Sequence, residues 1–175
     1  MSKFGKWVDE PLGGYVSPED VKELAESMGV KLVEEKEKHP IAGSTNIYSI
    51  GNRGLIRYSS EQQEEDQPDV RAYILLHELG HIRMGHGRGR GTPVGAVLEE
   101  LEADKWAFTV KRRIPMEDYV TAMLSAKAQD VGIFEFGLTK REAWRATVKA
   151  AKRFGVPKTL IAKGEKLYWK DVGRN

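Results

Sequence analysis

Two histidines and a glutamate stand together in the pentapeptide His77-Glu78-Leu79-Gly80-His81. Residues four apart on an α-helix share one face, so both imidazoles can bind one metal ion, each through a ring nitrogen. Glu78, beside the first histidine, can accept a proton from a water molecule that the ion activates. The pattern predicts a Zn²⁺ site with hydrolytic chemistry, in which His77 and His81 are ligands and Glu78 is the general base.

The composition limits which side chains could bind a metal ion. The chain of 175 residues contains no cysteine, which excludes disulfides and thiolate metal sites and leaves histidine and carboxylates as strong ligands. Its 40% apolar and 31% charged residues are typical of a soluble globular domain. The net charge of +2 gives no global argument for nucleic-acid binding. No apolar run reaches membrane-span length, so we expect a cytoplasmic protein without membrane contact.

The segment around the pentapeptide has the pattern of a buried helix. From Asp69 to about His86, apolar residues fall on more than one side of a helix, which favours burial inside the domain. Buried imidazoles and a buried carboxylate are costly unless they are neutralised, hydrogen-bonded or bound to a metal. Burial therefore favours a metal site over an accidental motif.

The third ligand must come from elsewhere, because catalytic zinc usually keeps three protein ligands. A metzincin pattern is excluded, since Met84 and Gly87 occupy the positions of its glycine and third histidine. A predicted helix at 96–113 carries Glu100 and Asp104 on one face, so Glu100 could bind zinc while Asp104 hydrogen-bonds a ligand histidine. Glu102 is the alternative ligand. For Glu99 and Glu102 the simpler interpretation is a charged, solvated helix face.

Two segments carry a family resemblance: Arg71 to His81 (RAYILLHELGH) and Glu100 to Ala107 (ELEADKWA). Together they resemble the paired motifs of the ImmA/IrrE family of gluzincin-type metallopeptidases, over roughly residues 17–115. The resemblance implies His77, His81 and Glu100 as zinc ligands and Glu78 as the base. It also implies a polypeptide substrate, such as a helix-turn-helix repressor. After the second motif, Phe108 to Pro115 (FTVKRRIP) is similar to the family in outline only.

Peptide hydrolysis also needs a donor that stabilises the oxyanion. Tyr58, Tyr73, His86 and Tyr119 are candidates, and the sequence does not choose among them. His86 has a second interpretation, as a cation at a helix C-terminus, and Tyr73 another, as a core residue. A strand at Leu55–Tyr58 on the edge of a sheet could receive an extended substrate by β-addition.

The elements that must position these residues form an α+β fold. A helix is expected from the cap Ser17 and Pro18 to Gly29, followed by a strand at 30–33 and a hairpin of strands at 47–50 and 54–58. An acidic loop follows at 61–69, and a glycine-rich loop at 85–95. The resulting small, about three-stranded sheet packs on a helical zincin-like core at 1–115. Residues 116–175 form a helical C-terminal region, with helices at 115–128 and 139–154, the latter opened by a Thr139/Glu142 capping box.

Two alternatives to a peptidase stay open. Ala151, Gly155 and Ile161 have the spacing of a helix-turn-helix, which would suit DNA binding, although Gly164 is expected to interrupt the second helix. Basic side chains accompany this segment: Lys140, Arg141, Arg145, Lys149, Lys152 and Arg153. A non-catalytic zinc protein that sequesters a regulator would share every ligand with the enzyme.

Overall fold

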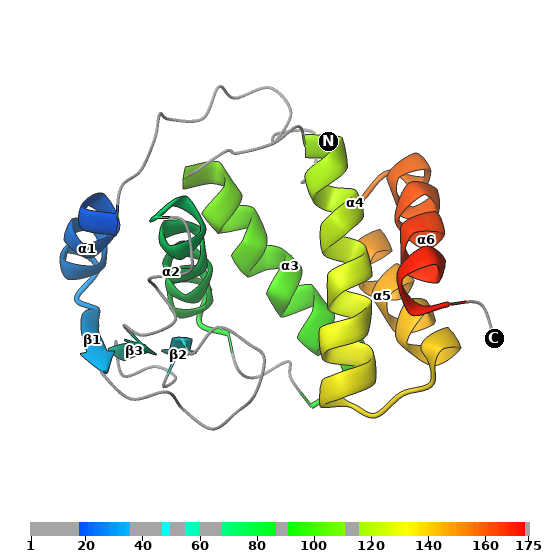
Figure 1. Ribbon diagram of the computed structural model, residues 1–175, viewed down its shortest axis with the longest axis horizontal. Helices are drawn as coiled ribbons and strands as arrows, with labels where there is room; N and C mark the ends of the chain where they lie inside the picture. The colour runs from blue at the N-terminus through cyan, green and yellow to red at the C-terminus, as the bar shows by residue number, and fades with distance from the viewer. Residues whose placement is uncertain are drawn as a thin grey trace. The chain divides into compact units, whose positions relative to one another are not determined.

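The computed structural model describes residues 18–35, 47–49, 55–59, 68–86, 91–110 and 116–173. The chain divides into two compact units that alternate along the sequence. The described part of the first, the sheet unit, lies within Leu12–Gly87 and Ala103–Arg112. That of the second, the helical unit, lies within Arg88–Glu102 and Arg113–Asn175. The boundary falls inside one continuous helix, α3 (Pro93–Val110), so this helix belongs to both units (Figure 1).

The sheet unit contains three short strands, β1 (Lys31–Glu35), β2 (Ile47–Ser49) and β3 (Leu55–Ser59). β3 is central: it pairs in parallel with β1 and antiparallel with β2, giving the order β1-β3-β2. β2 and β3 pair antiparallel, as the two strands of the predicted hairpin would, and the predicted turn between them lies outside the described residues. Residues 61–67 of the predicted acidic loop also lie outside the described residues, and its last two residues, 68 and 69, begin helix α2.

Two helices and part of a third complete the sheet unit. Helix α1 (Pro18–Ser27) has acidic residues in its first turn, and helix α2 (Pro68–Met84) carries the pentapeptide. Ile56 of β3 packs with apolar residues of these helices in one core, whose fully or nearly fully buried members include Val21, Ala25, Val30, Leu75, Leu76, Leu79 and Ala107. Burial of this apolar surface fixes α2 within the unit.

The helical unit contains α4 (Met116–Lys127), η4 (Ala128–Glu135), α5 (Lys140–Phe154) and α6 (Lys158–Val172). The predicted capping box is present: Glu142 N–H donates to the Thr139 hydroxyl oxygen, and Thr139 N–H donates to the Glu142 carboxylate. Helix α5 ends at Gly155, whose φ of 89° is left-handed and therefore suits glycine. Tyr168 of α6 is fully buried and stacks on Trp144 of α5.

The structure differs from the sequence prediction at three places. Helix α3 begins at Pro93, inside the predicted glycine-rich loop, because Thr92 caps it by accepting the Gly95 N–H at 3.1 Å. Residues Ala128–Glu135 form a π-helix, which was not predicted. Gly164 does not interrupt α6; it is buried, and a Cβ there would lie 3.3 Å from Leu124 and 3.4 Å from Trp144.

The described residues are mostly helical, which is the part of the α+β prediction that the structure confirms. Strand structure within them is confined to the three short segments of the sheet unit. The predicted boundary between residues 115 and 116 lies at the edge of a stretch that is not described, 111–115. No described helix combines the length and apolar character that a membrane crossing requires.

Candidate metal centre

Helix α2 presents the pentapeptide against α3. Leu75, Leu76 and Leu79 are buried in the core of the sheet unit, which holds the opposite side of the helix. Gly80 lies so close to α3 that an added Cβ would sit 2.9 Å from the Ala103 carbonyl oxygen. The missing side chain of Gly80 permits this close approach, which brings His77 and Asp104 within reach of each other.

His77 is oriented by Asp104. The His77 Nδ1 atom lies 2.7 Å from a carboxylate oxygen of Asp104, and the aspartate is 6% exposed. An acceptor on Nδ1 places the ring proton there and leaves Nε2 as the atom with a lone pair. Asp104 therefore occupies the place predicted for it, hydrogen-bonded to the far nitrogen of a candidate ligand.

His81 faces His77 with the same type of atom. The two Nε2 atoms are 3.0 Å apart, and the rings are nearly perpendicular, with an interplanar angle of 82°. On its other side, His81 Nδ1 lies 2.9 Å from Nδ1 of His86. Two ring nitrogens that point at one spot are the arrangement in which imidazoles share a metal ion.

Glu100 completes the group from α3, one helical turn before Asp104. One ligand atom each of His77, His81 and Glu100 lies within 4.8 Å of the others, and this group could hold a metal ion. Glu100 is 7% exposed and His81 is 9% exposed. Two imidazoles and one carboxylate are a donor set that binds zinc in many proteins.

A lysine lies beside the candidate carboxylate ligand. The Lys127 ammonium, at the end of α4, donates to Oε2 of Glu100 at 3.2 Å, and both side chains are largely buried. Nearby, partial burial raises the pKa of the Asp130 carboxyl; the charge of Lys127 lowers it, and that of Glu100 raises it. Nothing in the sequence links position 127 to position 100, so Lys127 was not predicted.

The other predicted residues have different outcomes. Glu99 is buried rather than solvated, which corrects the prediction of a charged solvent face there. Glu102 is half-buried and is not part of the candidate metal group among the described residues. His86 contacts His81, so its ring is already engaged at Nδ1. The side chains of Tyr58, Tyr73 and Tyr119, candidate oxyanion donors, lie outside the described part of the structure.

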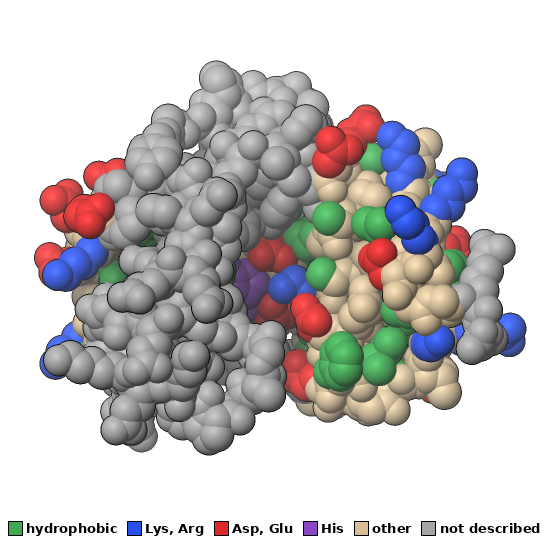
Figure 2. Space-filling model, in the orientation of Figure 1, with side chains coloured by type: hydrophobic (Ala, Val, Ile, Leu, Met, Phe, Trp, Pro, Cys, Tyr) green, Lys and Arg blue, Asp and Glu red, His purple; other side chains and the backbone are tan. Residues whose placement is uncertain are grey.

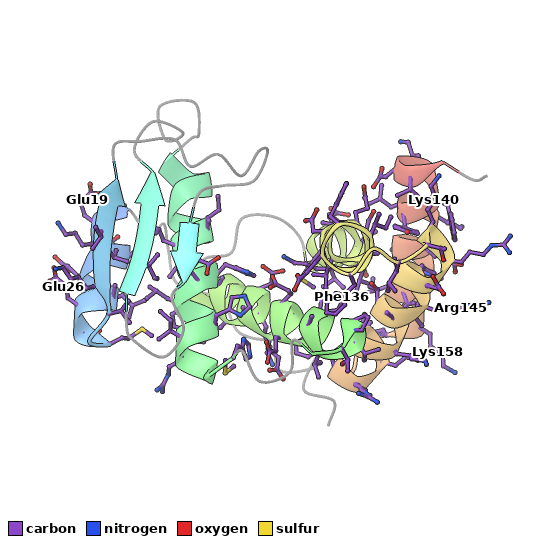
Figure 3. All side chains as sticks on the ribbon, turned by 90° about the horizontal axis from the view of Figure 1, so that it is seen from below. Glu19, Glu26, Phe136, Lys140, Arg145 and Lys158 are labelled. Carbon is purple, nitrogen blue, oxygen red and sulfur yellow. The ribbon has the colours of Figure 1, made fainter. Side chains whose placement is uncertain are left out.

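The basic residues noted in the sequence all lie on α5, and α6 adds Lys158 at its start. Arg145 and Lys158 are exposed and extend outward from these helices (Figure 3). On the face drawn in Figure 2, basic and acidic side chains are interspersed over the helical unit rather than gathered into one patch. DNA binding by this segment therefore stays a prediction that the surface does not strengthen.

Comparison of the chain with protein-family models, with curated proteins and with solved structures finds no match.

Proposed function

We propose that the protein is a zinc-dependent metallopeptidase that hydrolyses a polypeptide, with Glu78 as the general base and His77, His81 and Glu100 as the metal ligands. The observation that carries the proposal is the convergence of one ring nitrogen each of His77 and His81 and one Glu100 oxygen within 4.8 Å, together with the Asp104 carboxylate on His77 Nδ1. The pairing of the two motifs, similar to that of ImmA/IrrE peptidases, supports the same reading and a zincin-like, α+β fold.

The chain's own residues define the chemistry. A bound zinc ion supplies a Lewis acid and lowers the pKa of a coordinated water to about 7. His77 and His81 would hold the ion, and Asp104 keeps the proton of His77 on Nδ1, which leaves the other ring nitrogen free to bind. Glu78, half-buried and next to His77 in α2, takes the proton of the attacking water and returns it to the leaving amine.

Glu78→Gln tests the base directly. The variant should bind zinc as the wild type does, while hydrolysis of a fluorescently labelled unfolded protein such as casein falls by about 10²–10⁴-fold, since only the proton acceptor is lost. Glu26→Gln, an exposed carboxylate of α1 (Figure 3), is the matched control and should cleave normally. Undiminished cleavage by Glu78→Gln would exclude this base, and zinc binding without cleavage by any form would favour a sequestering role.

The ligand set has its own test. His81→Ala and Glu100→Ala should lose zinc, because each removes one of the converging atoms. Glu102→Ala should retain it, as measured by competition with a chelator of known affinity. If Glu102→Ala alone released zinc, the third ligand would be Glu102 and not Glu100.

A further inference from the structure

Three imidazoles form an unbroken chain at the C-terminal end of α2. His77 and His81 meet through their Nε2 atoms at 3.0 Å, and His81 and His86 meet through their Nδ1 atoms at 2.9 Å. The second pair is also edge-to-face, with ring centroids 5.0 Å apart. Asp104 closes one end of this chain on His77. His86 therefore stands to His81 as Asp104 stands to His77.

The backbone delivers His86 to this position. Gly85 follows α2 with a φ of +66°, and its N–H donates to the Ile82 carbonyl. The next N–H, of His86, donates back to the carbonyl of His81 at 3.0 Å. These are the two hydrogen bonds of a Schellman helix terminus, in which a left-handed residue turns the chain back over the last helical turn. The turn places the ring of His86 against that of His81.

The distance between the two Nδ1 atoms restricts their protons. A ring nitrogen that binds a metal carries no proton, so a neutral His81 that binds through Nε2 is protonated on Nδ1. That N–H points at His86 Nδ1, which must then be the acceptor. His86 consequently carries its own proton on Nε2. Each histidine then carries one proton, and His86 accepts the hydrogen bond that the Nδ1–H of a metal-bound His81 must donate.

We propose that His86 is a positioning residue for the metal ligand His81. Its Nδ1 atom accepts a hydrogen bond from the Nδ1–H of His81, and this bond keeps the Nε2 atom of His81 directed at the ion. This inference rests on the proposed metal site and assigns His86 a role different from that of an oxyanion donor. Outer partners of this kind change metal affinity by about 10–100-fold when they are removed. The half-buried position of His86 shields the hydrogen bond from full solvent competition.

Two substitutions of similar shape isolate the acceptor. His86→Leu places a methyl group near the position of Nδ1 and cannot accept a hydrogen bond, so zinc affinity should fall by about 10–100-fold. His86→Asn places an amide oxygen there and should restore affinity to within about threefold of the wild type. Arg83→Leu changes an exposed residue of the same helical turn and should bind zinc normally. Affinity is measured by chelator competition on the purified full chain, with circular dichroism to verify the fold.

Two further measurements separate positioning from general damage. Gly85→Ala leaves all three imidazoles in place but strains the left-handed turn, so it should weaken zinc binding less than His86→Leu does. In ¹⁵N-histidine spectra of the zinc-loaded wild type, His81 should be protonated on Nδ1 and His86 on Nε2.

The outcomes distinguish this inference from the proposed function. Wild-type affinity in His86→Leu, or a proton on Nδ1 of His86 in the zinc form, overturns the positioning role and leaves the peptidase proposal intact. Full hydrolysis by Glu78→Gln overturns the proposed base while the effect of His86→Leu on zinc affinity stands. A wild-type chain that binds no zinc overturns both.

Discussion

A buried carboxylate that is charged at neutral pH needs a compensating charge, since its transfer out of water is otherwise costly. Glu100 is a largely buried carboxyl group, and the ammonium of Lys127 lies 3.2 Å from its Oε2. A bound zinc ion would supply a second positive charge to the same carboxylate. Lys127 therefore contributes most to the stability of the metal-free protein, in which no zinc charge compensates Glu100.

Lys127→Met should destabilise the metal-free protein by about 1–3 kcal/mol, because it removes a charged partner of a largely buried carboxylate. With saturating zinc the loss should be smaller, since the ion compensates Glu100. Urea unfolding in chelator and in zinc measures both values. Lys163→Met is the control: its exposed ion pair with Glu117 should matter little in either condition. An equal loss for Lys127→Met with and without zinc would contradict the charge argument.

At the scale of helices, the site depends on how closely α2 approaches α3. The contact is backbone to backbone, between Gly80 and Ala103, and backbone atoms cannot move aside as flexible side chains do. A similar approach occurs in the helical unit, where a Cβ on Gly132 would sit 2.5 Å from the Ala143 side chain. At both positions glycine is required because neighbouring atoms leave no room for a side chain, and not because of its backbone dihedral angles.

Gly80→Ala should lower the free energy of unfolding by about 1–3 kcal/mol, although alanine favours helix more than glycine does by about 1 kcal/mol. The added methyl group would lie 2.9 Å from the Ala103 carbonyl oxygen and would force the helices apart. Gly91→Ala, where an added Cβ meets nothing within 4 Å, is the control for chemical denaturation. Stabilisation by Gly80→Ala would mean that α2 and α3 can separate without loss.

The capping box of α5 gives a stability term with a defined pH dependence. Hydrogen bonds from the hydroxyl and the N–H of Thr139 lower the pKa of Glu142 below its usual 4.5. The folded state thus favours the charged carboxylate. Its contribution is complete above pH 4.5 and is lost as the pH falls through the lowered folded pKa.

Glu142→Gln should therefore be less stable than the wild type near pH 7, and the difference should shrink as the pH falls below 4.5. Urea unfolding at several pH values between about 7 and 3 measures it. Glu165→Gln, an exposed carboxylate of α6, provides the comparison for general charge effects. A difference that does not change with pH would show that the charge of Glu142 is not what the cap uses.

At the scale of the whole molecule, zinc should act as a folding ligand. An ion bound only to the folded state stabilises it by about 2.7 kcal/mol when its concentration is 100 times Kd. For a chain of this size that corresponds to a rise in Tm of roughly 5–10 °C. Thermal melts with zinc and with chelator test this, and His81→Ala should show no rise. Equal Tm values for the wild type in both conditions would argue against a preformed site.

Local signals predicted much of this molecule. Pro18 and the Thr139/Glu142 box marked helix starts correctly, because a cap depends on residues adjacent in sequence. The four-residue spacing of His77 and His81 predicted that their rings meet. The shared face of Glu100 and Asp104 favoured Glu100 as the third member, with Glu102 left open as the alternative.

What the sequence did not predict depends on distant contacts. Gly164 resembles a helix breaker until its neighbours Leu124 and Trp144 are known, since their packing leaves no room for a side chain. The π-helix at Ala128–Glu135 has no periodic signature in a short segment. Lys127 meets Glu100 across 27 positions, and the parallel pairing of β1 with β3 likewise needs the folded chain.

The alternation of the two units along α3 has a consequence for how the chain is made. A ribosome releases residues in order, so the segments that begin the sheet unit emerge well before Trp106 and Ala107, which pack in its core. The turns of α3 that belong to the helical unit come out in between. At about 5–20 residues per second, the apolar face of α2 waits roughly 1–5 s for its last partner, and that of α1 roughly 4–16 s. During synthesis the sheet unit is thus an open structure that a later segment closes.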